Sequence, residues 1–175
     1  MKWIKIIAIN IGILLVFVLI VEGVLQFTQF KYKVLPTLEP RGYSVPDALV
    51  GYDIARDFPT TTSSFYDLSY EVSSNELGCF DYPYDGTSPY IFLTGDSFAW
   101  GWTALDDKWG KVIERETGVR TLTCGVNGYG TIQEFIKTQR TVQAIGKPPS
   151  VIIVGYLGAN DVDDDATFPN YTVQN

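Results

Sequence analysis

The first apolar segment of the chain is hydrophobic on every side. Residues 6–21 are apolar apart from one asparagine and one glycine, and Lys2 and Lys5 precede them. With Trp3 included, about 19 residues at 1.5 Å each span roughly 28 Å, close to the hydrocarbon core of a bilayer. A helix of a globular core would instead carry a single apolar stripe. The pattern therefore predicts a helix that crosses a membrane through residues 3–21.

The flanks of this segment indicate how it is processed and oriented. Residues 22–27 offer no small-x-small cleavage site, and no cysteine follows them that could be lipidated. We therefore expect an uncleaved signal anchor over residues 1–30, with a cleaved signal peptide as the alternative. Lysines lie at both ends, so the positive-inside bias towards a cytoplasmic N-terminus is small. The expected protein is membrane-anchored, with its globular part outside the cytoplasmic membrane, in the periplasm or at the cell surface.

Residues 31–88 show no long helical period. They contain five prolines and many tyrosines, too aromatic a composition for a disordered linker. The Thr/Ser run at residues 60–64 is typical of a turn or loop, and residues 65–72 alternate loosely, as a strand does. We expect an irregular lead-in that packs against the domain that follows.

Strand-like and helix-like patterns alternate from residue 89 onward. Apolar β-type runs cover residues 90–95, 119–124 and 150–157, and helical patterns cover residues 104–117 and 131–145. This order predicts an α/β domain with a parallel sheet, in which the loops after the strands share one rim.

The apolar positions within these elements predict how they are buried. The run at residues 150–157 is apolar on both faces, which predicts a buried interior strand and not an edge strand. Each helix is expected to pack through an apolar stripe: Trp109, Val112, Ile113 and Thr117 in the first, and Ile132, Phe135, Ile136 and Val142 in the second.

Composition excludes several classes of function. The net charge of −7 argues against non-specific nucleic-acid binding, and the 175 residues suffice for one modest domain. Cys79 and Cys124 are too few for a disulfide scaffold, and we expect two partly buried thiols. The acidic run at residues 161–166 lacks the glycine and the glutamate of a calcium loop, so we expect a solvated loop. Neither a cofactor nor a metal is predicted.

Polar and glycine residues that suit acyl transfer follow each of the three strands. Ser97 can act as a nucleophile, and its own backbone N–H can stabilise an oxyanion. Gly128 allows close approach of backbone to a tetrahedral intermediate, and Asn160 offers an amide donor. Each residue alone is more often structural, as a turn or a cap. Their position after three successive parallel strands makes the combination more specific.

Three motifs resemble those of the SGNH/GDSL hydrolases. The chain has Gly-Asp-Ser at residues 95–97, Gly-Val-Asn-Gly at residues 125–128 and Gly-Ala-Asn-Asp at residues 158–161. Residues 49–53 and 75–80 are similar to stretches that precede the serine in membrane-anchored relatives. The resemblance implies a flavodoxin-like, three-layer α/β/α fold whose N-terminal part is residues 89–175.

The resemblance also assigns roles to the three candidate residues. It makes Ser97 the nucleophile and an oxyanion donor, and it makes Gly128 and Asn160 the other oxyanion donors. Asp96 is implied to hold the turn, and Thr123 stands where the family pattern has asparagine. The implied substrate is a small-molecule or carbohydrate ester, which the enzyme would cleave as a GDSL-type esterase.

One element of that family is missing from the sequence. Serine esterases of this kind use an Asp-x-x-His block, and the chain contains no histidine. A carboxylate near its ordinary pKa is a poor base for a serine hydroxyl. We therefore expect a fragment of a longer gene product that is itself inactive. The alternatives are an O-acetyltransferase for extracellular polysaccharide, or a non-catalytic anchored binding module if the chain is truly 175 residues long.

Overall fold

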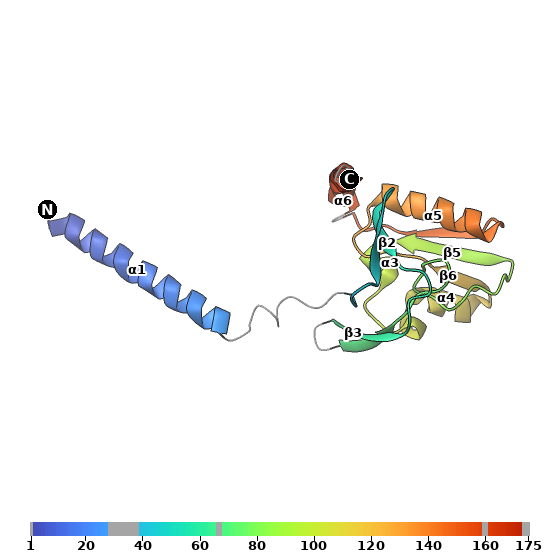
Figure 1. The fold of residues 1–175 in the computed structure, drawn as a ribbon, viewed down its shortest axis with the longest axis horizontal. Coiled ribbons are helices and arrows are strands. Elements are labelled where there is room, and N and C mark those ends of the chain that lie inside the picture. Colours follow the sequence, from blue (N-terminus) through green and yellow to red (C-terminus); the bar gives the residue numbers. More distant parts are fainter. Residues whose placement is uncertain (1, 28–38, 66–67, 159–160, 173–175) are drawn as a thin grey trace. The chain divides into compact units, whose positions relative to one another are not determined.

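The computed structural model describes residues 2–27, 39–65, 68–158 and 161–172 (Figure 1). It divides the chain into two compact units, Met1–Thr37 and Leu38–Asn175. The described part of the first unit is a single helix, and the second unit contains the sheets.

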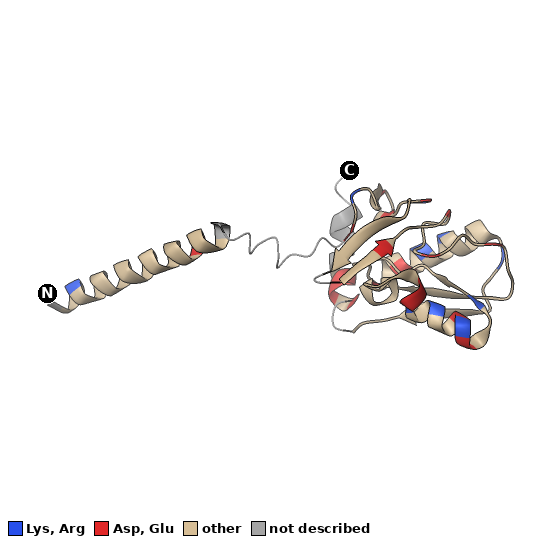
Figure 2. Ribbon diagram, turned by 90° about the horizontal axis from the view of Figure 1, so that it is seen from below, with Lys and Arg blue, Asp and Glu red and all other residues tan. Residues whose placement is uncertain are grey.

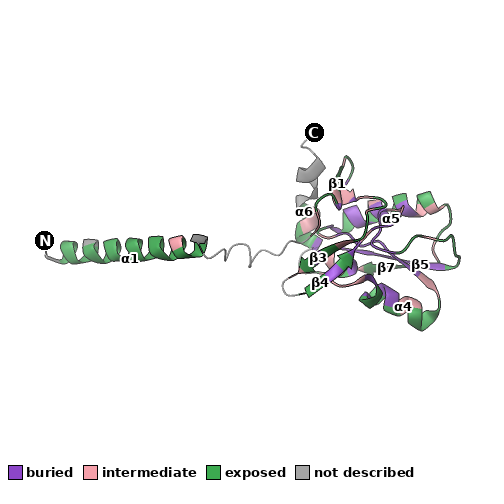
Figure 3. Ribbon diagram, turned by 60° about the horizontal axis from the view of Figure 1, so that its bottom comes forward, coloured by how far each residue is buried: buried purple, intermediate pink, exposed green. Residues whose placement is uncertain are grey.

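Helix α1 (Lys2–Phe27) confirms the expected apolar N-terminal helix. Its stretch Trp3–Leu25 is 23 residues long, and its length and composition are sufficient to cross a membrane. Figure 2 shows charge only near its two ends, and Figure 3 shows nearly all of its described residues as exposed.

The lead-in forms two antiparallel hairpins, of which the sequence indicated one strand: the strand expected at residues 65–72 is confirmed over Leu68–Val72. Strand β1 (Ser44–Asp47) pairs with β2 (Gly51–Ile54), and β3 (Thr61–Phe65) pairs with β4 (Leu68–Val72). The loop expected at residues 60–64 is therefore wrong, since most of it is β3. Pairing with β4 satisfies the backbone of β3, and threonine is itself a good strand former.

Three parallel strands form the sheet of the domain. Strand β5 (Tyr90–Gly95) lies in the centre, with β6 (Arg120–Thr123) on one side and β7 (Val151–Gly155) on the other. Ile91 is level with Thr121 of β6 and with Val151 of β7, so the three strands run in step. The predicted α/β class and parallel sheet are confirmed.

Helices cover both faces of this sheet. Gly110 of α4 (Trp109–Thr117) lies so close to Leu93 and Thr123 that an added Cβ would clash with the Thr123 hydroxyl. Helix α5 (Thr131–Ile145) packs Val142 against the cluster that contains Phe92. Phe92 and Leu93 are neighbours on one strand and point to opposite faces, so α4 and α5 lie on opposite sides.

The predicted apolar stripes of α4 and α5 are only partly correct. Val142 and Ile136 pack inward, whereas Phe135 is 66% exposed and the side chains of Lys111 and Lys137 are buried. Each buried lysine has an acidic partner with an N–O distance of 2.6 Å, Asp81 for Lys111 and Asp53 for Lys137. Paired charges tolerate burial, and a hydrophobicity pattern contains no information on pairing.

The prediction of an interior position for the third strand is wrong within the described residues. Strand β7 pairs with β5 alone and forms one edge of the sheet. Val151, Ile152 and Val154 are each about half exposed, at 50%, 49% and 50%. The apolar run correctly indicates two apolar faces, but its composition does not specify how many neighbours the strand has.

The acidic segment after β7 is also different from the expectation. Residues 161–166 belong to helix α6 (Asp161–Thr172) instead of a solvated loop. Asp161, Asp163 and Asp164 stand in its first turn. Negative side chains are favourable there, because the N-terminal end of a helix carries partial positive charge.

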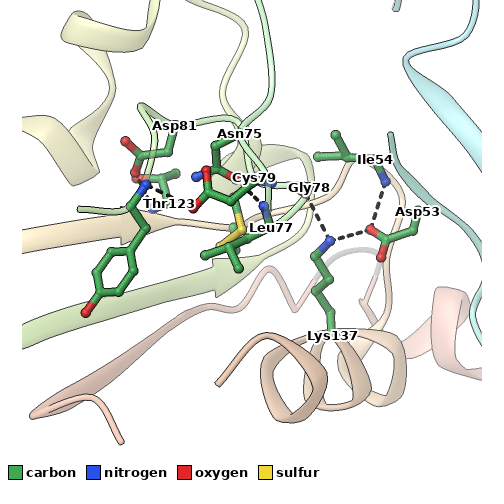
Figure 4. Close-up of a disulfide and its surroundings, with 12 residues drawn as sticks. Asp53, Ile54, Asn75, Leu77, Gly78, Cys79, Asp81, Thr123 and Lys137 are labelled. Carbon is green, nitrogen blue, oxygen red and sulfur yellow. Dashed lines mark hydrogen bonds and ion pairs between the residues drawn. A yellow bond between two sulfur atoms is a disulfide. The ribbon is translucent and has the colours of Figure 1, made fainter. Parts of the chain in front are cut away.

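Cys79 and Cys124 form a disulfide, so the expected pair of thiols is wrong. Both residues are fully buried, and their Cα atoms are 4.4 Å apart. Figure 4 shows the bond beside the turn that contains Leu77 and Gly78. The count of two cysteines, 45 residues apart, gave no sign that folding brings the turn after β4 to the end of β6.

Candidate active site at the carboxyl ends of the parallel strands

Ser97 follows the central strand after a turn that only glycine can make. Gly95, the last residue of β5, has a φ of 146°. A Cβ at this position would lie 2.7 Å from the Ala99 side chain and 2.7 Å from the Gly155 carbonyl oxygen. The strand can therefore end against β7 and turn sharply, which places Ser97 at the carboxyl rim of the sheet.

Asp96 holds the turn from inside. It is fully buried and is the N-cap of the one-turn helix α3 (Ser97–Trp100), where its Oδ1 accepts a hydrogen bond from the Phe98 N–H at 2.9 Å. The Ser97 hydroxyl lies 3.5 Å from Asp96 Oδ2, the outer limit of a hydrogen bond. The implied holding role of Asp96 is consistent with this geometry, and the Ser97 hydroxyl is only weakly engaged.

The loop after β6 lies against this turn. The Val126 N–H donates to the Gly95 carbonyl at 2.9 Å, which fixes the start of the loop beside the end of β5. Gly128 is exposed farther along this loop, with a φ of 78°. The Tyr52 hydroxyl donates to the Asn127 carbonyl at 2.8 Å, so strand β2 supports the loop from the lead-in. Ser97 and Gly128 therefore occupy adjacent loops at one rim.

Asn160 lies outside the described residues, but its neighbours define the third loop. Gly95 and Gly155 are level in the pairing of β5 with β7, so this loop leaves the same rim. After the two undescribed positions, Asp161 is buried, and its Oδ2 accepts a 2.6 Å hydrogen bond from the Leu157 N–H. Two of the three predicted site residues, Ser97 and Gly128, are thus placed at one rim.

A buried carboxyl beneath this rim was not anticipated from the sequence. Glu134 of α5 is 2% exposed, and neither of its carboxyl oxygens has a hydrogen-bond partner in the described part of the chain. Burial, followed by the charges of Asp161, Asp96 and Asp165, raises the pKa of Glu134 to about 8. Glu134 is therefore mostly protonated at neutral pH. The sequence around Glu134, between Ile132 and Ile136, gives no sign that its carboxyl group is buried.

The pKa of Asp161 is raised in the same surroundings. Burial raises its pKa, the hydrogen bond from Leu157 opposes this rise, and the charge of Asp96 adds to it. The charge of Asp96 thus raises the pKa of both Glu134 and Asp161 beneath the rim. Within the described ranges, no three His, Cys, Asp or Glu side chains are arranged to hold a metal ion.

A groove of about 510 Å³ runs between α5 and β7. Its lining is largely apolar and includes Thr94, Glu134, Phe135, Ile152 and Val154. Thr94 is the residue before the Gly95 turn, so the groove begins under the candidate site. Its floor is the half-exposed face of β7.

Comparison of the chain with protein-family models, with curated proteins and with solved structures gives no match. Any assignment of function therefore rests on the residues at this rim.

Proposed function

We propose that this chain carries the nucleophile half of a membrane-anchored, SGNH-like serine hydrolase that acts on esters of small molecules or carbohydrates. One observation carries the proposal: Ser97 stands two residues after the end of the central strand of a parallel sheet, at the rim where its neighbouring strands also end. Ligands of open α/β sheets bind at this edge, where the strand order reverses. Ser97 would attack the ester carbonyl and form an acyl-enzyme.

The backbone around Ser97 supports the stabilisation of an oxyanion. The Ser97 N–H stands at the first position of α3, where helix N–H groups have no partner within the helix. Gly128 presents backbone without a Cβ in the adjacent loop, and Asn160 follows the third strand in the sequence. In this proposal these three groups form the oxyanion hole.

The strand order supports the finer fold assignment. The first strand of the sheet is central, the second lies on one side and the third on the other. This is the start of the 2-1-3-4-5 order of flavodoxin-like folds, which is the basis for proposing a three-layer SGNH domain. The lead-in adds support. Residues 49–53 are one of the stretches that resemble the family, and the hydrogen bond from the Tyr52 hydroxyl to the Asn127 carbonyl connects this stretch to the loop that contains Gly128.

The base is the missing component. The chain has no histidine, and Asp96 is committed to the Phe98 N–H. We propose that these residues hold the nucleophile without its base, so that the chain alone turns over esters poorly. Acyl transfer to a sugar hydroxyl would use the same acyl-enzyme with a different acceptor.

The disulfide supports an extracytoplasmic location for the domain. Disulfides persist in oxidising compartments, and the bond joins two fully buried residues. Helix α1 would then anchor the protein in the membrane, with the domain in the periplasm or at the cell surface.

A fluorophosphonate probe tests the proposal on the full chain in detergent micelles. Imidazole should accelerate labelling, because it supplies the missing base, and Ser97→Ala should abolish it. Ser150→Ala is the matched control, since Ser150 is an exposed serine at the amino end of β7. Labelling of Ser150→Ala should equal that of the wild type. The hydrolase proposal fails if the folded wild type is unlabelled at every imidazole concentration.

The absence of histidine also favours a second candidate, a non-catalytic anchored module that binds glycans through the same rim. That function predicts no labelling at any imidazole concentration, together with retention of the micelle-bound protein on immobilised polysaccharide. Loss of this retention in a rim variant such as Gly128→Arg would favour the module.

A further inference from the structure

Lys108 has an unusual place and an unusual orientation. It is the N-cap residue of α4, a position that usually carries Ser, Thr, Asp or Asn, and its side chain makes no capping bond there. The side chain is buried and turns back towards α3 instead. Its Nζ donates to the carbonyl of Gly101 at 2.7 Å and to the carbonyl of Trp100.

The rest of the Lys108 environment is aromatic. Its Nζ lies 3.8 Å from the centroid of the Phe80 ring and 4.9 Å from that of the Trp100 ring. Both rings belong to a buried cluster that includes Tyr43, whose hydroxyl accepts a hydrogen bond from the Trp100 indole at 3.1 Å. An ammonium over ring faces gains cation–π stabilisation, which offsets part of its desolvation.

Helix α3 depends on such outside contacts. A single helical turn has little stability of its own, because most of its carbonyls lack partners within it. The Ser97 carbonyl accepts from the Gly101 N–H at 2.8 Å. The Phe98 carbonyl accepts from the Trp109 indole at 3.1 Å, and the carbonyls of Trp100 and Gly101 accept from Lys108. Two consecutive residues at the start of α4 therefore hold the carbonyl side of the turn.

We propose that Lys108 is a positioning residue for Ser97: its buried ammonium clamps the end of the turn that presents the serine. The contacts of Lys108 show that it holds the turn. Its effect on catalysis rests on the proposed function of Ser97 as the nucleophile. Lys108 acts on the serine through the backbone of α3.

The surroundings of Lys108 also make the clamp sensitive to pH. Burial lowers its pKa to about 7, and the charge of Asp81 opposes this shift. Asp81, on the segment after β4, also pairs with Lys111 of α4 at 2.6 Å and with Arg120 of β6 at 3.1 Å. Hydrogen bonds from a charged donor are about twice as strong as those from a neutral one. The clamp therefore weakens as the pH rises through neutrality.

Hydrogen exchange tests the clamp without requiring activity. In the full chain in micelles at pH 6.5, Lys108→Met should reduce protection of residues 96–102 about tenfold, while residues 90–95 of β5 stay protected. Lys111→Met is the matched control. It removes another buried lysine, in the first turn of α4, which pairs with Asp81 and does not contact α3 in the described structure. It should leave residues 96–102 as in the wild type. Unchanged protection in Lys108→Met, or an equal loss in Lys111→Met, would overturn the proposal.

The serine itself gives a second measurement. With imidazole present, fluorophosphonate labelling of Ser97 should be about tenfold slower in Lys108→Met and within twofold of the wild type in Lys111→Met. Lys108→Arg, which keeps the charge, should recover part of the rate. Wild-type protein that is never labelled contradicts the hydrolase function, and hydrogen exchange then still decides whether the clamp exists. Equal labelling rates in the wild type and Lys108→Met would refute the positioning role.

Discussion

Reduction of the Cys79–Cys124 bond should destabilise the domain substantially. The bond closes a loop of 45 residues. The chain-entropy relation for a loop of this length gives about 4 kcal/mol at 25 °C, because the bond restricts the unfolded chain. Domains are stable by roughly 5–15 kcal/mol, so this loss is a large share of the total. The reduced protein should remain folded at low temperature but unfold at much lower denaturant.

Urea unfolding of the full chain in micelles, with and without dithiothreitol, measures this effect. With a slope of about 2 kcal/mol per molar urea, the midpoint should fall by roughly 2 M on reduction. A double variant, Cys79→Ala with Cys124→Ala, is the control, since the reductant should not change its midpoint. A shift below about 0.5 M on reducing the wild type would refute the reasoning, and would mean that the unfolded chain is already compact or that the bond strains the fold.

Two further perturbations test the rim. Gly95→Ala should destabilise the domain by about 3 kcal/mol and abolish labelling of Ser97, because the new Cβ would clash with Ala99 and with the Gly155 carbonyl. Gly158→Ala is the control and should cost less than about 0.5 kcal/mol, since the nearest atom to its Cβ would be at an ordinary 3.6 Å. Equal urea midpoints for the two variants would contradict this account. Glu134 binds a proton more tightly in the folded chain, where its pKa is about 8, than in the unfolded chain, where it is 4.5. Its contribution to stability is therefore complete below pH 4.5 and is lost as the pH rises through 8, with a slope of at most about 1.4 kcal/mol per pH unit. Glu134→Gln should reduce this slope in urea midpoints measured from pH 5 to 8, and an unchanged slope would show that Glu134 does not titrate in that range.

The core of the domain could be predicted from the sequence because its signals are local. The apolar run at residues 90–95, the glycine that ends it and the serine that follows need only a strand and a turn to be placed correctly. The succession of strands and helices then fixes a parallel sheet with its loops on one rim. Residues 131–145 form the second helix with the expected bounds.

The features that escaped prediction depend on contacts between distant parts of the chain. Nothing local to Cys79 shows that Cys124 will meet it, and nothing local to residues 60–64 shows the strand that pairs with them. Burial of Lys108 and Glu134 follows from neighbours that the fold supplies. A hydrophobicity pattern assigns both residues to the surface, and the contacts of Lys108 with α3 and the burial of Glu134 became visible only in three dimensions.

The disulfide has a mechanical consequence for a protein held at its N-terminus. A force between α1 and the C-terminal part of the domain would be transmitted along the backbone only as far as Cys79, and would then cross the covalent bond to Cys124. While the bond is intact, the segment between these residues, which includes β5, Ser97 and Lys108, cannot be pulled out to its full length. Tension can therefore stretch the lead-in hairpins without extending the turn that presents the serine.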